Sequence, residues 1–187
     1  MPVSFLIALA LSPGDKVRLF LWPDTMASGT FVVQEDGTCN LPVLGRVKVA
    51  GKEPEKLRQE LEEAYSKYYS SLTLTVEPLY RVFVVGEVRK AGAVYITGSE
   101  SVLEVVAMAG PTHDADLSGV QLVKRKGSQR VNLSKALKEG LSALEAGVES
   151  GAVILVPRRL LARLRDWSVV LGFLSAALSL YVYISAR

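Results

Sequence analysis

Apolar and polar residues alternate along most of this chain, and turns that contain glycine or proline interrupt the alternation at short intervals. Val17, Leu19 and Leu21 show the two-residue period of a half-buried strand. Asp36-Gly37 is a hairpin-turn pair, since glycine adopts positive φ without steric cost. Further short strands are expected at residues 31–34, 39–41 and 45–49. The pattern predicts a meander in which each strand buries one face.

Residues 52–69 depart from this alternation and have the spacing of an amphipathic helix, with Pro54 in the first turn, where a missing N–H is harmless. The apolar positions are Leu57, Leu61, Ala64, Tyr65 and Tyr68. The charged face is either a solvated surface or a subunit contact. A strand with Leu72, Leu74 and Val76 on one side is expected to follow.

The strand pattern restarts at Tyr80, and Ser101 and Glu104 have the spacing of a capping box at the start of a short helix that ends at Gly110-Pro111. More short strands follow, the last of which ends at Pro157. We therefore predict an α+β protein with two small mixed domains, residues 12–78 and 79–157.

Composition excludes several classes of function. The net charge of +3 arises from basic residues interleaved with acidic ones, which argues against nucleic-acid binding. Cys39 is the one cysteine, so an intrachain disulfide and a thiolate metal cluster are excluded, and a packed thiol in a strand is expected.

Catalytic chemistry finds little support in this sequence. His113, the one histidine, lies beside Asp114 and Asp116, but the surrounding sequence supplies no second imidazole and no nucleophile. "VVGEVRKAG" lacks the spacing of a phosphate-binding loop. No catalytic residue, cofactor or metal site is predicted.

The N-terminal segment, residues 1–11, contains an apolar run from Phe5 to Leu11 with no lysine or arginine before it. This segment is interpreted as the remnant of a signal peptide, as a first strand, or as the result of a misplaced start codon or a truncated start.

The last part of the chain predicts a membrane span. The run from Trp167 to Ile184 has no charged residue and is just long enough to cross a bilayer, so a transmembrane helix is expected at 167–185. Trp167, Tyr181 and Tyr183 are expected to be interfacial anchors. A buried core helix is the alternative. An arginine-rich linker, residues 158–166, precedes the span.

Ser168, Gly172, Ser175 and Ser179 form a stripe of small residues on one side of this expected helix. The stripe predicts close helix packing, and a single lipid-embedded anchor with incidental serines is the alternative.

Several stretches together resemble a known family. "SPGDKVRLFLW", "VVQEDGTCNLPVLGRVKVAGKEPEKLRQEL" and "LTLTVEP" resemble the export domain of bacterial outer-membrane polysaccharide export proteins. "RVFVVGEVRKAGAVYITGSESVLEVVAMAG", "QLVKRKG" and "SGAVILVP" resemble the β-grasp (SLBB-like) domain that follows it in that family. The resemblance covers about Leu11 to Pro157.

The resemblance implies a homo-oligomeric ring with periplasmic domains that passes capsular polysaccharide or exopolysaccharide across the outer membrane without chemical change. It also implies a polysaccharide co-polymerase or kinase partner in the inner membrane, and a small-residue stripe that could line a pore. Because arginines precede the span, a tail-anchored inner-membrane protein is the alternative orientation. The rival function is a membrane-tethered β-grasp module that binds glycan or protein, with Arg89, Lys90 and Tyr95 as candidate glycan contacts.

Overall fold

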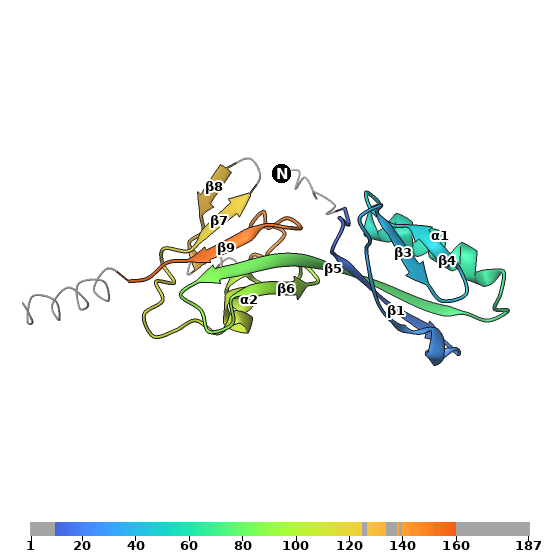
Figure 1. Cartoon of the computed structure of the whole chain (residues 1–187). Coiled ribbons are helices and arrows are strands. Elements are labelled where there is room, and N and C mark those ends of the chain that lie inside the picture. The colour runs from blue at the N-terminus through green and yellow to red at the C-terminus, as the bar shows by residue number, and fades with distance from the viewer. Residues whose placement is uncertain (1–9, 125–126, 134–137, 139, 160–187) are drawn as a thin grey trace, which may run out of the picture.

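The computed structural model describes residues 10–124, 127–133, 138 and 140–159 (Figure 1). It confirms the α+β class: two helices pack on one long twisted sheet, and a separate hairpin completes the N-terminal half. The elements are β1 (Lys16–Trp22), a short 3-10 helix (Thr25–Ala27), β2 (Gly29–Val32), β3 (Thr38–Leu41), β4 (Gly45–Lys48), α1 (Pro54–Ser66), β5 (Thr73–Gly86), β6 (Gly92–Ile96), α2 (Val102–Ala109), β7 (Gln121–Lys124), β8 (Gly127–Arg130) and β9 (Val153–Val156).

The local signals were largely correct. Pro54 begins α1, and Ser101 and Glu104 form the expected capping box at the start of α2. The strand expected at 31–34 begins earlier, at Gly29, because its pairing with β1 runs from Leu19↔Gly29 to Lys16↔Val32.

Strand β5 is the main departure from the sequence-based expectation. Two strands separated near Pro78 were expected, but Thr73–Gly86 forms one strand of 14 residues through both halves (Figure 1). Its first half pairs with β1, and its second half pairs with β6 and β9. One sheet, with β2, β1, β5, β9, β7 and β8 in that order and β6 beside β5, therefore joins the two halves.

The two faces of this sheet differ. One face carries the buried alternate residues of the strands, such as Leu19, Val82 and Ile154, which form one core together with side chains of α1 and α2. On the opposite face, β1 presents Arg18, Phe20 and Trp22, which are exposed. We call this second side the open face; it extends across both halves.

β1 and β9 lie end to end on one edge of β5. Phe83 and Val84 pair with both β6 and β9, so these two strands are on opposite edges. The N–H of Arg81 donates to Asp15, which precedes β1, and its C=O accepts from Gly151, which precedes β9. Since the N–H and C=O of one strand residue point to the same edge, β1 and β9 share that edge, and Arg81 lies at the gap between them.

The Asp15 carboxylate closes this gap, and its side chain is fully buried. One oxygen accepts the N–H of Arg81 and the hydroxyl of Ser150, both at 2.7 Å, and the other accepts the N–H of Ser12 at 2.8 Å. The three donors come from the N-terminal turn, from β5 and from the loop before β9. A buried donor without a partner is costly, so this one side chain ties three distant segments together.

Gly14 makes the same junction possible at the backbone. It has φ +91, and a Cβ atom there would lie 2.3 Å from the Arg81 guanidinium carbon. Arg81 Nη2 donates to the Pro13 carbonyl at 3.3 Å. Glycine therefore supplies both the backbone conformation and the space that the guanidinium fills.

Cys39 is a packed core residue, as expected. Its thiol is buried and lies 3.3 Å from the Val32 carbonyl as a weak donor. Burial raises the pKa of the Cys39 thiol from 9.0 to about 11, so the thiol is protonated at neutral pH.

We expect Asp15→Ala to lower the free energy of unfolding by about 3 kcal/mol, because it leaves three buried or half-buried donors without their acceptor. Ser150→Ala, which removes only one donor, should cost about 1 kcal/mol. Urea unfolding of the full-length protein measures both. Equal losses in the two variants would contradict the role given to the carboxylate.

A second prediction concerns alkaline pH. Because the folded state favours the neutral Cys39 thiol, its stabilising effect is full below pH 9 and is lost as pH rises from 9 towards 11. Between pH 8 and pH 10.5 the protein should lose about 2 kcal/mol more unfolding free energy than Cys39→Ser, which cannot ionise there. Parallel unfolding curves at the two pH values provide the comparison, and identical losses would show that the thiol does not titrate in this way.

Candidate functional site

The candidate glycan contacts do not form one cluster. Arg89 and Lys90 are exposed in the turn between β5 and β6, where their backbone N–H groups donate to the Gly110 and Ala109 carbonyls at the end of α2. Tyr95 lies near the opposite end of β6, opposite Arg81 in the register. The fold therefore separates Tyr95 from the other two residues, and the role of all three in glycan binding stays a prediction.

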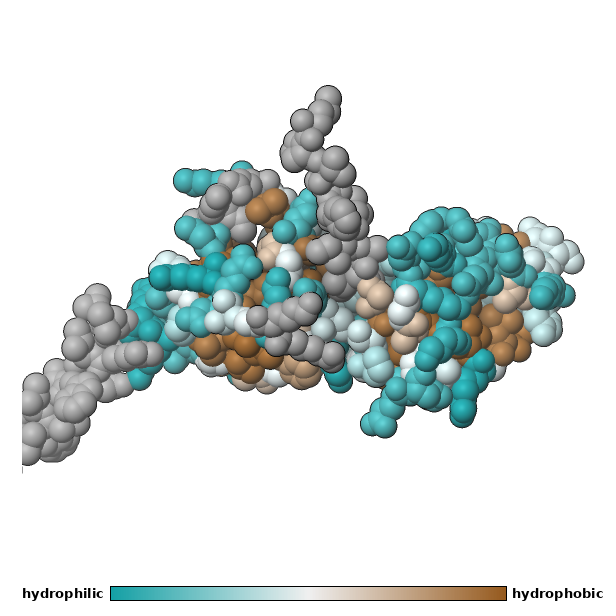
Figure 2. Space-filling model, turned by 90° about the horizontal axis from the view of Figure 1, so that it is seen from above, coloured by the Kyte–Doolittle hydropathy of each residue, from teal (hydrophilic) through white to brown (hydrophobic). Residues whose placement is uncertain are grey.

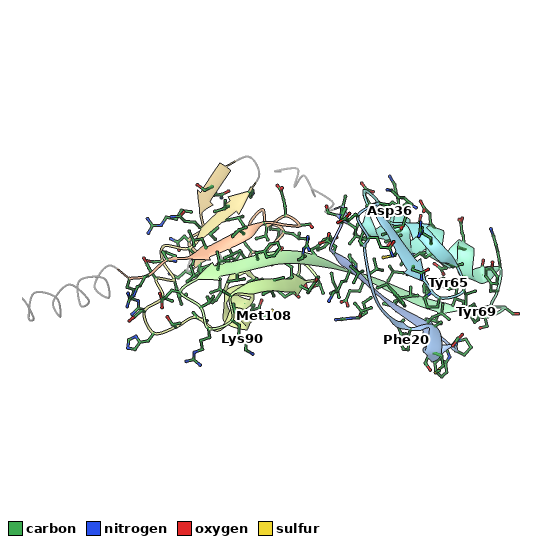
Figure 3. The ribbon with its side chains drawn as sticks, viewed as in Figure 1. Phe20, Asp36, Tyr65, Tyr69, Lys90 and Met108 are labelled. Carbon is green, nitrogen blue, oxygen red and sulfur yellow. The ribbon has the colours of Figure 1, made fainter. Side chains whose placement is uncertain are left out.

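Tyr95 instead meets a residue of the N-terminal half. The ammonium of Lys16 lies 3.8 Å from the centre of the Tyr95 ring, within cation–π range. Lys90 lies near Met108 in the C-terminal half, far along the molecule from Phe20 (Figure 3). The sequence did not reveal the contact between Lys16 and Tyr95, because it depends on β1 and β6 flanking β5.

Exposed apolar side chains gather in the N-terminal half. Phe20 and Trp22 lie on the open face of β1 with 48% and 56% of their surfaces exposed. Met26, in the 3-10 helix next to β1, is 94% exposed. Figure 2 shows hydrophobic surface on both halves of the molecule. The sequence contained a signal for two of these residues: if Val17, Leu19 and Leu21 are buried, Phe20 and Trp22 must point outward.

Two tyrosine hydroxyls, one on α1 and one in the segment that follows it, bind the loops of this half. Tyr65 donates to the Pro42 carbonyl at 2.9 Å in the turn between β3 and β4. Tyr69 donates to the Asp24 carboxylate at 2.7 Å, which raises the pKa of the Tyr69 hydroxyl. Figure 3 shows both rings on the same side of the molecule, and their centres are 6.3 Å apart. Fixed loops of this kind give the apolar side chains a defined position.

A second set of contacts fixes the chain where it leaves β9. Arg158 Nη2 donates to the Asp114 carboxylate at 3.1 Å, and Arg158 Nε lies 4.0 Å from Glu87. Arg159 donates through its backbone N–H to the Asp114 carbonyl and through Nε to the Ala115 carbonyl. The exit of the chain from β9 is thus attached to the loop that follows α2.

The geometry of the described residues does not assemble a catalytic or metal site. His113 is exposed in the loop after α2, while Asp114 is engaged by Arg158 and Asp116 accepts from Ser118. The latter contact lowers the pKa of the Asp116 carboxyl. Within these residues, no group of three or more His, Cys, Asp or Glu side chains is placed to hold a metal ion.

The predictions for the C-terminal segment lie outside the described residues. They concern the helix at 167–185, the stripe Ser168, Gly172, Ser175 and Ser179, and the anchors Trp167, Tyr181 and Tyr183. In the part of the chain that the structure describes, no helix is long and apolar enough to cross a membrane. The predicted signal remnant at 1–11 also falls almost entirely outside that part.

Comparison with known proteins agrees with the resemblance seen in the sequence. A family model described as polysaccharide biosynthesis/export protein matches residues 8–78, and an SLBB domain model matches residues 80–156. Two curated relatives from Escherichia coli, both named polysialic acid transport protein KpsD, are 31% and 30% identical to this chain over 159 residues. Each alignment covers 80% of this chain and 28% of the relative, so the chain spans less than a third of their length.

The two family matches occur in the order expected from the sequence motifs, and together they include nearly all residues that the structure describes. The chain therefore belongs to the polysaccharide export family, with a polysaccharide biosynthesis/export domain followed by an SLBB domain.

Proposed function

We propose that this chain is a structural subunit of a homo-oligomeric channel that exports capsular polysaccharide or exopolysaccharide across the outer membrane. A role in polysaccharide export follows from its family. The channel, the ring and the absence of chemistry on the polymer are the further steps of the proposal. Its domains would stand in the periplasm.

The observation that carries the proposal is the continuous sheet. Strand β5 runs through both halves, and Asp15 joins the ends of β1 and β9 along its edge. A conduit wall needs units that keep their shape over their whole length, because a flexible link would let the lumen close. Two domains joined by one strand meet that need better than two domains joined by a loop.

The side chains of the described residues support transport of a polymer that is not chemically changed. Among the described residues, His113 is exposed, its neighbours Asp114 and Asp116 are engaged by Arg158 and Ser118, and the Cys39 thiol is buried and protonated. The relatives' printed name, polysialic acid transport protein, also describes transport. A polymer that passes through without chemical change needs a hydrated surface, but it does not need an acid and a base that converge on one bond.

The membrane and partner assignments complete the proposal. The predicted helix at 167–185 would anchor the ring or line its pore, and the contacts of Arg158 and Arg159 would fix its starting point. An inner-membrane polysaccharide co-polymerase or kinase is the proposed partner. A tail-anchored protein of the inner membrane is the alternative placement.

A second candidate function is a membrane-tethered module that binds glycan or protein and forms no pore. The open face favours it, because a sheet face with exposed aromatic side chains can bind a partner without assembly into a ring.

Particle mass and symmetry separate the two functions. We expect the full-length protein in detergent to form closed rings, and a version that ends at Arg159 to lose or weaken them, because it lacks the predicted helix. Native mass spectrometry and electron microscopy of both samples measure this. A monomer in both samples would contradict the channel and leave the tethered module as the better account.

A further inference from the structure

We propose that the open face over the domain junction is a binding site for an anionic polysaccharide. This inference rests on the proposed role in polysaccharide export and deepens it, since it assigns an acidic polymer to a particular surface. The site consists of Lys16, Arg18, Phe20 and Trp22 on β1, together with Arg81 on β5. We call these five residues the β1 track.

The strand registers place the whole track on one face. The residues on β1 are alternate positions, and Lys16 pairs with Leu79, which is two residues from Arg81 on β5. Tyr95 lies opposite Arg81 on β6, and its ring meets the Lys16 ammonium. Six residues of extended strand separate Lys16 from Trp22, so the track is roughly 20 Å long. That length suits a polymer better than a single small ligand.

Charge is unbalanced along this face. The registers of β1, β2, β5 and β6 place Lys16, Arg18 and Arg81 on it, and Glu77 is the one acidic side chain that they place there. Glu77 forms an ion pair with Arg18, in which Arg18 Nη1 lies 2.6 Å from Glu77 Oε2. The Asp15 carboxylate also lies at the junction, but it is buried and accepts hydrogen bonds from Ser12, Arg81 and Ser150. Lys16 and Arg81 are therefore the charges that the open face presents at the junction, which favours an anionic partner.

Both cations are held in position before any ligand arrives. Lys16 lies over Tyr95, and the Arg81 guanidinium lies 5.3 Å from the Phe83 ring while it donates to the Pro13 carbonyl. Arg81 Nε is buried and has no hydrogen-bond partner among the described residues. Leu79 lies beneath these two cations and is only 6% exposed, although it is not part of the main core. Its side chain therefore packs under the open face and not in the core. Cations fixed in this way lose little side-chain entropy on binding.

The aromatic end of the track determines the class of anion. Phe20 and Trp22 offer flat apolar surfaces two residues apart, and Thr75 and Thr73 lie opposite them on β5 with exposed hydroxyl-bearing side chains. Sugar rings present apolar C–H faces and hydroxyl edges, so such a strip suits them, whereas an acidic peptide or a phosphate would need only the cations. An acidic glycan uses both parts.

Titration calorimetry of the full-length protein in detergent tests this site, with polygalacturonate as the acidic polymer and dextran as the neutral one. We expect polygalacturonate to bind and dextran to bind at least about tenfold more weakly. The Lys16→Gln/Arg81→Gln variant should weaken polygalacturonate binding about tenfold or more, since it removes two charge-assisted contacts. Added salt should weaken binding to the unchanged protein.

Lys56→Gln/Lys67→Gln is the matched control, because it removes the same charge from exposed positions in α1 and at its C-terminal end, on the side of the sheet opposite the open face. It should change binding less than about twofold if only long-range charge is lost. Equal losses in the two double variants would overturn the site, as would loss in the control alone. Because Arg81→Gln also removes the contact with Pro13, Lys16→Gln alone and Trp22→Ala are measured too, each with its thermal unfolding temperature.

Trp22→Ala distinguishes a glycan site from a general anion surface. It should weaken binding of polygalacturonate but leave binding of polyglutamate unchanged, and an equal effect on both polymers would overturn the glycan assignment. Particle mass is recorded on the same samples. Rings that do not bind polygalacturonate would overturn this inference alone, whereas binding by a monomer would overturn the channel and leave the site intact.

Discussion

The structure depends on the Asp15 carboxylate. It lies just before β1, next to the loop that leads into β9, and it accepts hydrogen bonds from the backbone of Ser12 and Arg81 and from the Ser150 hydroxyl. Without it, the N–H of Arg81 would face a gap in the sheet edge with no strand to accept its hydrogen bond. The side chain thus substitutes for a missing strand residue, and β5 can continue from one domain into the next.

Continuity of β5 has a functional consequence. Because the helices α1 and α2 pack on the same face of one sheet, the opposite face runs uninterrupted across the export and SLBB domains. Residues from both domains therefore share a surface, as Lys16 and Tyr95 do. The proposed channel subunit would have one continuous wall, and the proposed glycan site lies on that wall at the junction.

The C-terminal side of the molecule is fixed by a different type of contact. Arg158 and Arg159 attach the chain after β9 to the loop around Asp114 through ion pairs and backbone hydrogen bonds. These groups are half-buried or exposed, so each contact is weaker than those of Asp15. Together they still give the chain a defined direction as it leaves the SLBB domain.

Local physics in the sequence determined much of this protein. Alternation predicted most strands, helical spacing predicted α1, and the capping box of Ser101 and Glu104 predicted the start of α2, because each depends on residues a few positions apart. The motifs also sufficed to recognise the family, which the family matches confirm. For Phe20 and Trp22 the outward direction was implicit in the burial of Val17 and its alternate neighbours.

Only the tertiary structure decided how the halves join and which residues meet. Two strands separated near Pro78 were expected, but the missing N–H of Pro78 points to the edge of β5 away from β1, so one strand continues through it. Tyr95 was named with Arg89 and Lys90 as a candidate glycan contact of the β-grasp domain, and the pairing of β6 places its ring against Lys16, away from the other two residues. The role of Asp15 was invisible for the same reason, since its partner Ser150 is 135 residues away and contacts at such separation leave no periodic trace in the sequence.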